Sequence, residues 1–315
     1  MRAAYASAIN PDDPLAGLTV GELPDPTPEE GWVSVEVRAS ALNHHDLWSL
    51  RGVGLPAERL PMILGCDAAG VDDAGNEVVV FPVLLDPHDA RGFSLLSERH
   101  PGTLADRVAV PRENLIPKPT GVSFTDAACL PTAWLTAYQM LNKGRVGEAD
   151  AVLVQGAGGG VATAAVVLAA GFGKRVYASS RDPEKRERIA ALGATAVEPG
   201  ARLPERVDLV IETVGAATFD HSLKCCAPNG RIVVSGATGG NLATVDLRRV
   251  FAFRLEILGS SMGTPDELAA LLDLVANGTV KPVIDGVLGF DQVREGFERL
   301  RSGRVFGKVV FDHTR

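Results

Sequence analysis

The chain of 315 residues is long enough for two domains with substantial cores, and its 46% hydrophobic and 22% charged residues are an ordinary globular balance. A net charge of −8 argues against nucleic acid or an acidic membrane surface as a partner. The amino terminus lacks a signal-peptide pattern and the four cysteines do not suggest a disulfide framework, so we expect a soluble cytoplasmic protein.

The first third of the chain predicts short strands separated by turns. Residues 31–41 alternate apolar and polar with a period of two, and residues 75–81 and 104–110 have the composition of further strands. Prolines at 24, 26 and 28 exclude regular structure over 23–29. Short strands at this spacing predict a partly closed β-barrel.

After residue 119 the pattern changes to alternating strands and helices. A helix is predicted over 126–141, capped by Ser123 or Thr125. Predicted strands at 151–155, 175–179, 208–212 and 231–235 alternate with predicted helices at 160–170, 183–192 and 219–226. This order predicts an α/β fold with a doubly wound parallel sheet. The tail predicts helices at 265–276 and 290–302, an extended segment at 281–288 and a strand at 308–311.

A glycine-rich segment, VQGAGGGVA at 154–162, joins a buried strand to an apolar helix. Glycine permits the turn and the close approach of backbone to a pyrophosphate, and the helix N-terminus offers unpaired N–H groups. A purely structural turn is the alternative. We predict that a dinucleotide diphosphate binds at Gly156, Ala157, Gly158, Gly159, Gly160 and Val161, with Ala157, Gly159 and Ala162 in the three small-residue positions.

The following strand ends without the acid that usually holds the ribose 2′-hydroxyl of NADH. Ser179, Ser180, Arg181 and Lys185 instead offer hydroxyls and positive charge suited to a 2′-phosphate, which favours NADPH as cofactor. The alternative is that the two cations are simply solvated at a helix start. Further cofactor contacts are expected after other strand ends, where the crevice of such a sheet lies, at Val214, Gly236, Ala237 and Thr238.

Six segments resemble a known family: ALNHHDLWSLRG (41–52), ILGCDAAGV (63–71), AACLPTAWLTAY (127–138), QGAGGGVATAAVVLAAGFG (155–173), IETVG (211–215) and GKVVF (307–311). On these motifs the chain is identified as a member of the medium-chain dehydrogenase/reductase superfamily, and it is most similar to the zinc-free quinone oxidoreductase-like branch. The resemblance implies a GroES-like domain at 1–120, a Rossmann NADP-binding domain at 121–262 and a return segment at 263–315. It also implies a cofactor in the cleft between the domains, a homodimer or homotetramer, and cofactor contacts at Ser260, Ser261 and Lys308.

Zinc-dependent members of that superfamily place Cys, His and Cys in three of these motifs, where this chain has Asn43, Cys66 and Thr132. Asn and Thr do not complete a tetrahedral N/S zinc site, and residues 82–102 contain no cysteine for a structural zinc. We therefore predict no metal, although His45 and Cys66 could in principle bind one. The departure puts alcohol oxidation in doubt, because that chemistry relies on zinc.

Without a Lewis acid the site suits a quinone or an α,β-unsaturated carbonyl as hydride acceptor. By resemblance Asn43 and Thr132 lie near the nicotinamide, and Asn43 is the first candidate for stabilising the substrate oxygen. His45 is the candidate proton donor, and the alternatives are a structural or exposed histidine and a proton from solvent, since no tyrosine occurs between Tyr5 and Tyr138. Asp46 caps a helix beginning near Leu47 or takes a catalytic part. Two other functions stay open: an enoyl-thioester reductase and a non-catalytic NADPH-binding sensor or interaction protein.

Overall fold

A computed structural model describes residues 1–315 and divides into two units. Unit 1 comprises Met1–Thr132, Thr264–Gly278 and Ile284–Arg315, and unit 2 comprises Ala133–Gly263 and Thr279–Val283. The first division lies later in the chain than the boundary expected at residue 120, and residues 279–283 group with unit 2 rather than with the tail.

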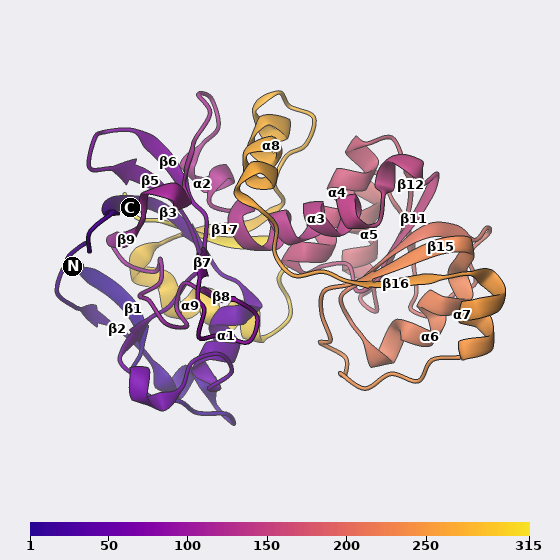
Figure 1. Ribbon diagram of the computed structural model, residues 1–315, viewed down its shortest axis with the longest axis horizontal. Coiled ribbons are helices and arrows are strands. Elements are labelled where there is room, and N and C mark those ends of the chain that lie inside the picture. The colour runs from indigo at the N-terminus through magenta and orange to yellow at the C-terminus, as the bar shows by residue number, and fades with distance from the viewer. The chain divides into compact units, whose positions relative to one another are not determined.

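Unit 1 is built on a sheet in the order β10-β6-β5-β3-β18-β17, with β9 also paired to β3, on a three-stranded sheet β2-β1-β4 and on the hairpin β7-β8 (Figure 1). Its strands are β1 (Arg2–Ala6), β2 (Leu18–Glu22), β3 (Trp32–Ala41), β4 (Met62–Ile63), β5 (Asp67–Asp72), β6 (Glu77–Val80), β7 (Val83–Leu85), β8 (Phe93–Leu95), β9 (Arg107–Pro111), β10 (Leu115–Pro117), β17 (Ile284–Gly289) and β18 (Lys308–Asp312). Its helices are α1 (His44–Leu50), α2 (Phe124–Ala127), α8 (Pro265–Ala276) and α9 (Val293–Arg301).

The last strand of the chain lies beside one of the first. β18 pairs antiparallel with β3, so that Val310 faces Ala41 and Asp312 faces Ala39. The predicted strand at 308–311 therefore completes the amino-terminal sheet. This pairing carries Lys308, at the start of β18, to the residues that follow the end of β3.

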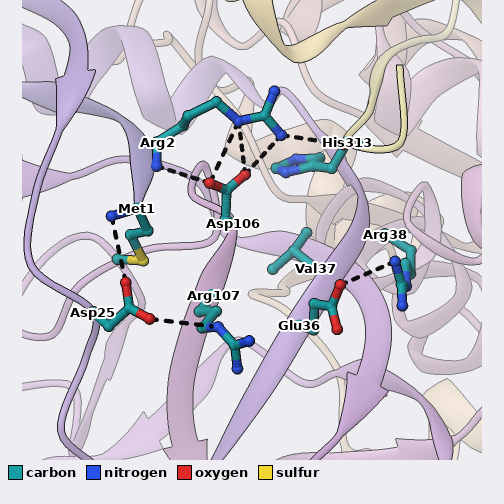
Figure 2. A pocket seen from close by; sticks show the side chains of 9 residues that line it. All are labelled: Met1, Arg2, Asp25, Glu36, Val37, Arg38, Asp106, Arg107 and His313. Atoms are coloured by element: carbon teal, nitrogen blue, oxygen red, sulfur yellow. Dashed lines mark hydrogen bonds and ion pairs between the residues drawn. The ribbon is translucent and has the colours of Figure 1, made fainter.

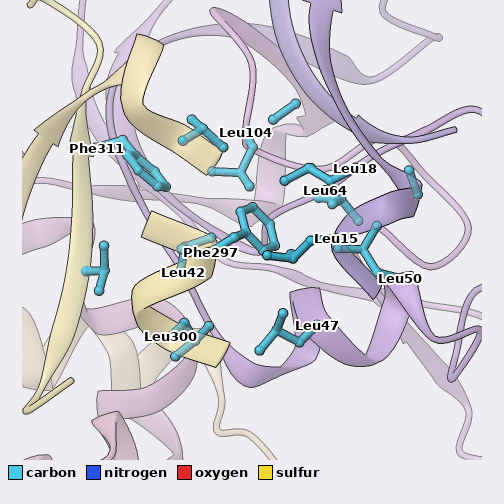
Figure 3. Packing of buried hydrophobic residues seen from close by; sticks show 14 of the residues in the cluster. Leu15, Leu18, Leu42, Leu47, Leu50, Leu64, Leu104, Phe297, Leu300 and Phe311 are labelled. Atoms are coloured by element: carbon cyan, nitrogen blue, oxygen red, sulfur yellow. The ribbon is translucent and has the colours of Figure 1, made fainter. Parts of the chain in front are cut away.

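Helix α9 closes the core of unit 1. Its apolar residues Val293, Phe297 and Leu300 recur at the spacing of one helix face and are buried. Figure 3 shows Phe297 among leucines that include Leu47 and Leu50 of α1. Burial of each such side chain stabilises the fold by about 1.5–3 kcal/mol. The contact with α9 therefore anchors α1, the helix that carries His45 and Asp46.

Unit 2 contains a six-stranded parallel sheet in the order β13-β12-β11-β14-β15-β16, as the strand–helix alternation predicts. Helices α3 and α4 cover one face, and α6 and α7 cover the other (Figure 1). Its strands are β11 (Ala151–Val154), β12 (Arg175–Ser179), β13 (Thr195–Val197), β14 (Val207–Glu212), β15 (Cys226–Val234) and β16 (Glu256–Gly259), and its helices are α3 (Leu135–Lys143), α4 (Gly160–Gly171), α5 (Pro183–Ala191), α6 (Ala216–Cys225) and α7 (Leu247–Phe253).

The single helix predicted over 126–141 is wrong. Ser123 does cap a helix, by accepting the Asp126 N–H, but that helix is only α2, and a π-helical turn over Leu130–Trp134 precedes α3. Pro131 has no N–H to continue regular α-helical bonding, which accounts for the interruption. No helix of the protein combines the length and apolar character needed to cross a membrane.

Candidate active site

Asn43 stands at the junction between β3 and α1, in an extended conformation that precedes the first helical residue, His44. The buried Asp46 carboxylate accepts the Asn43 N–H at 2.8 Å and the Gly65 N–H at 2.9 Å. The expectation that Asp46 precedes a helix beginning near Leu47 is therefore wrong, because the helix begins three residues earlier. From the first turn of α1, one Asp46 oxygen therefore binds the N-cap backbone at Asn43, and the other binds the distant backbone at Gly65.

A buried cation fixes the Asn43 side chain. Lys308 Nζ donates to Asn43 Oδ1 at 2.7 Å, to Asp67 Oδ2 at 2.7 Å and to the Leu42 carbonyl at 2.8 Å. Asn43 Nδ2 in turn donates to Asp67 Oδ2 at 2.9 Å. Asp67 is fully buried and Lys308 is 2% exposed, so this is an ion pair removed from water.

This arrangement decides what Asn43 can offer. Its oxygen accepts from the Lys308 ammonium, so the amide cannot flip by exchanging its oxygen and nitrogen. Its nitrogen donates one hydrogen to Asp67 and has a second hydrogen left for another acceptor. The three donors of Lys308 are all used inside unit 1, which leaves none for the cofactor contact expected of it. The structure instead makes Lys308 the residue that orients Asn43.

His45 lies between an acid and a thiol. Its Nε2 is 3.2 Å from Glu98 Oε1, and its Nδ1 is 3.4 Å from Cys66 Sγ. Burial lowers the pKa of His45, but the neighbouring Cys66, Glu98 and Asp46 outweigh this effect and hold the pKa well above its usual value. Glu98, which lies in the loop after β8, was not among the predicted site residues, because nothing in its local pattern marks a contact with residue 45.

Thr132 falls in the π-helical turn, and its Oγ1 is buried without a hydrogen-bond partner. A buried hydroxyl without a hydrogen-bond partner destabilises the fold, and a bound ligand atom would supply the partner that Thr132 lacks. Pro131 interrupts the regular helix and produces this turn, and the turn sets the position of Thr132.

The residues in the zinc-ligand positions do not fit a zinc ion. The amide of Asn43 is occupied by Lys308 and Asp67, and a fixed ammonium beside it opposes a second positive charge. A different group, His45, Asp46 and Cys66, places potential ligand atoms within 4.8 Å of one another. Both Asp46 oxygens already accept backbone N–H groups there, and His45 Nε2 faces Glu98.

In unit 2 the predicted phosphate loop follows β11 and leads into α4, which begins at Gly160. Gly156 has φ +70°, and a Cβ atom there would lie 2.4 Å from Val214 Cγ2. Gly158 has φ +133°, and a Cβ atom there would lie 2.8 Å from the Lys185 side chain. Only glycine is compatible with both positions, and Gly159 leaves open space before the helix N-terminus. This geometry fits a diphosphate.

The four residues predicted to hold a 2′-phosphate differ in availability. Ser179 is fully buried: its hydroxyl donates to Gln155 Oε1 at 2.6 Å and accepts the Gly156 N–H, so it supports the loop from beneath. Ser180 Oγ accepts the Asp182 N–H at 3.3 Å. Arg181 is exposed and its guanidinium has no partner in the structure, and Lys185 is half-buried against Gly158.

Asp182 follows Arg181 but does not replace the missing acid. It is the N-cap of α5, and its carboxylate accepts the backbone N–H groups of Glu184 and Lys185. The positive group that remains at the end of β12 is therefore Arg181.

The other predicted cofactor residues lie after the carboxyl ends of neighbouring strands. Val214 is half-buried after β14, and Gly236, Ala237 and Thr238 follow β15. Beneath them the fully buried Glu212, which was not among the predicted site residues, accepts the N–H groups of Val214 and Gly215 and the hydroxyls of Thr218 and Ser222. An acid at the buried carboxyl end of β14 could have indicated such a support.

Ser260 and Ser261 come directly after β16, the edge strand. Ser260 donates its hydroxyl to Gln139 Oε1 at 2.7 Å, whereas Ser261 is exposed. Only the second hydroxyl is therefore free for a ligand.

Unit 1 also has a hollow of about 390 Å³ on its surface (Figure 2). Its charged side chains pair with each other, as Arg2 does with Asp106, Arg107 with Asp25 and Arg38 with Glu36. None of the predicted site residues lines this hollow, so it is separate from the candidate site.

Comparison with known proteins agrees with this architecture. The family model for the alcohol dehydrogenase GroES-like domain matches residues 29–120, and the model for zinc-binding dehydrogenases matches residues 185–311. The chain is 31% identical to 2-methylene-furan-3-one reductase of Solanum lycopersicum, over 90% of this chain and 72% of the relative. It is 29% identical to acryloyl-coenzyme A reductase of Metallosphaera sedula, over 93% of this chain and 96% of the relative.

Among solved structures, an NAD-dependent alcohol dehydrogenase superposes with a TM-score of 0.89 at 37% identity, and the match covers 99% of each chain. Unit 1 is GroES-like and contains the cluster of polar side chains, and unit 2 is a doubly wound Rossmann unit that contains the glycine loop. Together with these matches, the two units define an oxidoreductase. The chain belongs to the medium-chain dehydrogenase/reductase superfamily, which confirms the predicted family and fold class.

Proposed function

We propose that the protein is an NADPH-dependent reductase that passes hydride to a quinone or to an α,β-unsaturated carbonyl compound, without catalytic zinc. One observation carries the proposal. Lys308 and Asp67 hold the Asn43 amide so that it presents an N–H donor where zinc-dependent relatives place a metal ligand. A hydrogen-bond donor suffices for an acceptor whose developing charge is spread by conjugation, whereas an isolated alcohol needs a stronger electrophile.

Unit 2 would hold the dinucleotide. The diphosphate would bind the backbone at 156–161 and the N-terminus of α4, and the residues after β14, β15 and β16 would line the rest of the crevice. When bound, the cofactor supplies the hydride. The solvent-facing guanidinium of Arg181, with no acid left free at the end of β12, favours a 2′-phosphate and hence NADPH over NADH.

Unit 1 would act on the substrate. Asn43 donates to the carbonyl oxygen and stabilises the charge that forms there, and the unpartnered Thr132 hydroxyl adds a second donor. Lys308 and Asp67 do not touch the substrate; they hold the amide in one orientation, so no reorganisation is needed during the reaction. His45 supplies the proton.

The thioester form of the substrate is the second candidate. Acryloyl-coenzyme A reductase, whose name denotes a conjugated thioester substrate, matches nearly the whole chain. The name of 2-methylene-furan-3-one reductase denotes a conjugated ketone. Both substrates are polarised double bonds, so one site chemistry serves either. A sensor that binds NADPH without turnover is the remaining alternative.

We further propose that the enzyme is a homo-oligomer in the cytoplasm. The edge strand β16 has no neighbour on its outer side and exposes Ile257, and the nearby helix α7 exposes Leu247 and Phe251. A second copy of the chain would cover this edge as a homodimer, and a homotetramer would use an additional contact. All four cysteines are free thiols, which suits a reducing compartment.

The decisive experiment is NADPH oxidation by the purified protein with matched panels of quinones, enones and enoyl thioesters, with NADH in parallel. We expect turnover on conjugated acceptors, none on saturated ketones, and no loss after treatment with a chelator. Turnover that requires stoichiometric zinc would refute the zinc-free proposal. Tight NADPH binding with no turnover on any acceptor would leave the sensor as the better account.

A further inference from the structure

Glu98 is held by two groups besides His45. Its Oε2 accepts the Leu95 N–H at 3.0 Å and pairs with Arg91 Nη2 at 2.8 Å, while its Oε1 faces His45 Nε2. The residue is 4% exposed, and the pKa of its carboxyl, although raised by burial, is lowered overall to about 2 by the hydrogen bonds of His45, Arg91 and Leu95. Glu98 is therefore a fixed anion on one side of the imidazole.

The other side of the imidazole faces sulfur. Cys66 Sγ lies 3.4 Å from His45 Nδ1, and its own hydrogen goes to the Leu96 carbonyl at 3.2 Å. Burial raises the pKa of the Cys66 thiol more than His45 lowers it, so the sulfur is a neutral thiol. A neutral thiol sulfur is a weak acceptor, which leaves the Nδ1–H loosely held.

An acid, a histidine and a cysteine in a row also describe a nucleophile with its base. That role does not fit here, because Cys66 is fully buried and its pKa is raised, whereas a nucleophilic cysteine is exposed and easily ionised. The imidazole carries the charge instead, because the anion of Glu98 lies 3.2 Å from Nε2 and Asp46 also favours the protonated ring. The neutral Cys66 thiol contributes only a weak acceptor, and Arg91 faces the ring only through Glu98.

We infer that His45 donates the proton of the reduction from Nδ1, and that Glu98 is the positioning residue that anchors Nε2 and keeps the ring charged. The inference rests on the proposed function. After hydride adds to the conjugated system, an electron pair remains on the α-carbon of an enolate or on a quinone oxygen. The N–H bond at Nδ1 breaks, the proton bonds to that atom, and the neutral imidazole regains a proton from solvent. Cys66 holds the Nδ1–H until a better acceptor, the substrate, replaces it.

The test measures the proton on His45 directly, in the whole protein and without substrate. Histidine-labelled protein is titrated by NMR, with the His45 signal assigned by its loss in His45→Gln among the six histidines. Glu98→Gln keeps the shape and removes the charge, and we expect it to lower the His45 pKa by roughly one unit or more. Asp89→Asn is the matched control, because Asp89 pairs with the same Arg91 at 2.9 Å but does not contact His45.

The second measurement is the pH profile of turnover with whichever acceptor is reduced. We expect the rate to fall on the alkaline side as His45 loses its proton, this limb to move to lower pH in Glu98→Gln, and the limb to vanish in His45→Gln. The affinity for NADPH should stay unchanged in His45→Gln, Glu98→Gln and Asp89→Asn.

A His45 signal that titrates at the same pH in Glu98→Gln as in the wild type would overturn the role of Glu98. An alkaline limb that persists in His45→Gln would overturn the role of His45, and this variant decides the matter if Glu98→Gln does not fold. Absence of turnover in the wild type would refute the reductase proposal instead, while the NMR titration would still test the anchoring by Glu98.

Discussion

Lys308 Nζ lies 2.7 Å from Asp67 Oδ2, although the two residues are 241 positions apart in the chain. Neither side chain reaches solvent to more than 2%, and Asp67 Oδ1 has no partner. A buried pair of this kind stabilises little compared with an apolar pair of the same volume, but it is costly to break. Its value in this protein is the orientation it gives to Asn43.

Replacement of Lys308 by Met tests that pairing. It leaves the Asp67 carboxylate buried without a counter-charge, so we expect a loss of about 3–5 kcal/mol in the free energy of unfolding. The measurement is urea unfolding followed by tryptophan fluorescence, with unfolding of the two units fitted separately.

Two comparisons make that result interpretable. The double variant Lys308→Met/Asp67→Asn should recover part of the loss, since the uncompensated charge is gone. Asp220→Asn breaks an exposed pair with Lys224 and should cost under about 1 kcal/mol. A loss in Lys308→Met no larger than that of Asp220→Asn would contradict the buried ion pair.

Replacement of Asn43 by Ala should lower kcat by roughly 10²–10³, the usual effect of removing one donor to a developing oxyanion. The dissociation constant of NADPH should not change, because Asn43 acts on the substrate. Steady-state kinetics and nucleotide titration measure the two quantities. Asn76→Ala, which removes an amide that binds Asp72 in a turn, is the control and should leave both unchanged. Equal kcat in the two variants would remove Asn43 from the mechanism.

Replacement of Arg181 by Ala should weaken NADPH binding by about tenfold or more, the worth of a charge-assisted hydrogen bond, and leave NADH binding unaltered. Fluorescence titration with both nucleotides measures the difference. Arg202→Ala removes another exposed cation of unit 2 and should affect neither nucleotide. NADPH binding as tight in Arg181→Ala as in the wild type would count against the assignment of the 2′-phosphate.

His313 makes the stability of the protein depend on pH. Burial lowers its pKa from 6.5 to about 4, since Ser40 Oγ binds Nε2 at 2.8 Å but Nδ1 is buried without a partner. Below pH 6.5 the unfolded chain therefore binds a proton that the folded chain refuses. We expect about 3 kcal/mol of stability, fully present above pH 6.5, to be lost as the pH falls through about 4.

Urea unfolding at a series of pH values measures this loss. His313→Gln keeps a polar partner for Ser40 and cannot take up the proton, so its stability should fall less over the same interval. Parallel curves for the two proteins would show that other groups govern the acid side.

The sequence predicts well those elements whose pattern is local. The strand at 175–179 and the helix at 265–276 have the predicted bounds, because a run of buried residues over 176–179 and a capping box at Thr264 each mark the element within a few residues. The strands Arg2–Ala6 and Leu18–Glu22 were missed, since their short alanine- and glycine-containing runs become strands only by pairing with each other.

The same distinction holds for the candidate site. Asn43, His45 and the glycine loop stand in contiguous motifs and were predicted as site residues, and that assignment stays a prediction. Glu98, Asp67 and the inward role of Lys308 depend on contacts between distant segments, which no local pattern reveals. Lys308 and Asp67 each begin a largely apolar strand, and two opposite charges in such positions could have indicated their pairing.

The ammonium group beside Asn43 also bears on how this protein could be converted into a metalloenzyme. Exchanging Asn43, Cys66 and Thr132 for cysteine, histidine and cysteine would recreate a familiar ligand set while leaving a permanent positive charge among those ligands. Engineering a zinc centre into this scaffold would therefore begin with the removal of Lys308, at the far end of the chain, before any ligand is introduced.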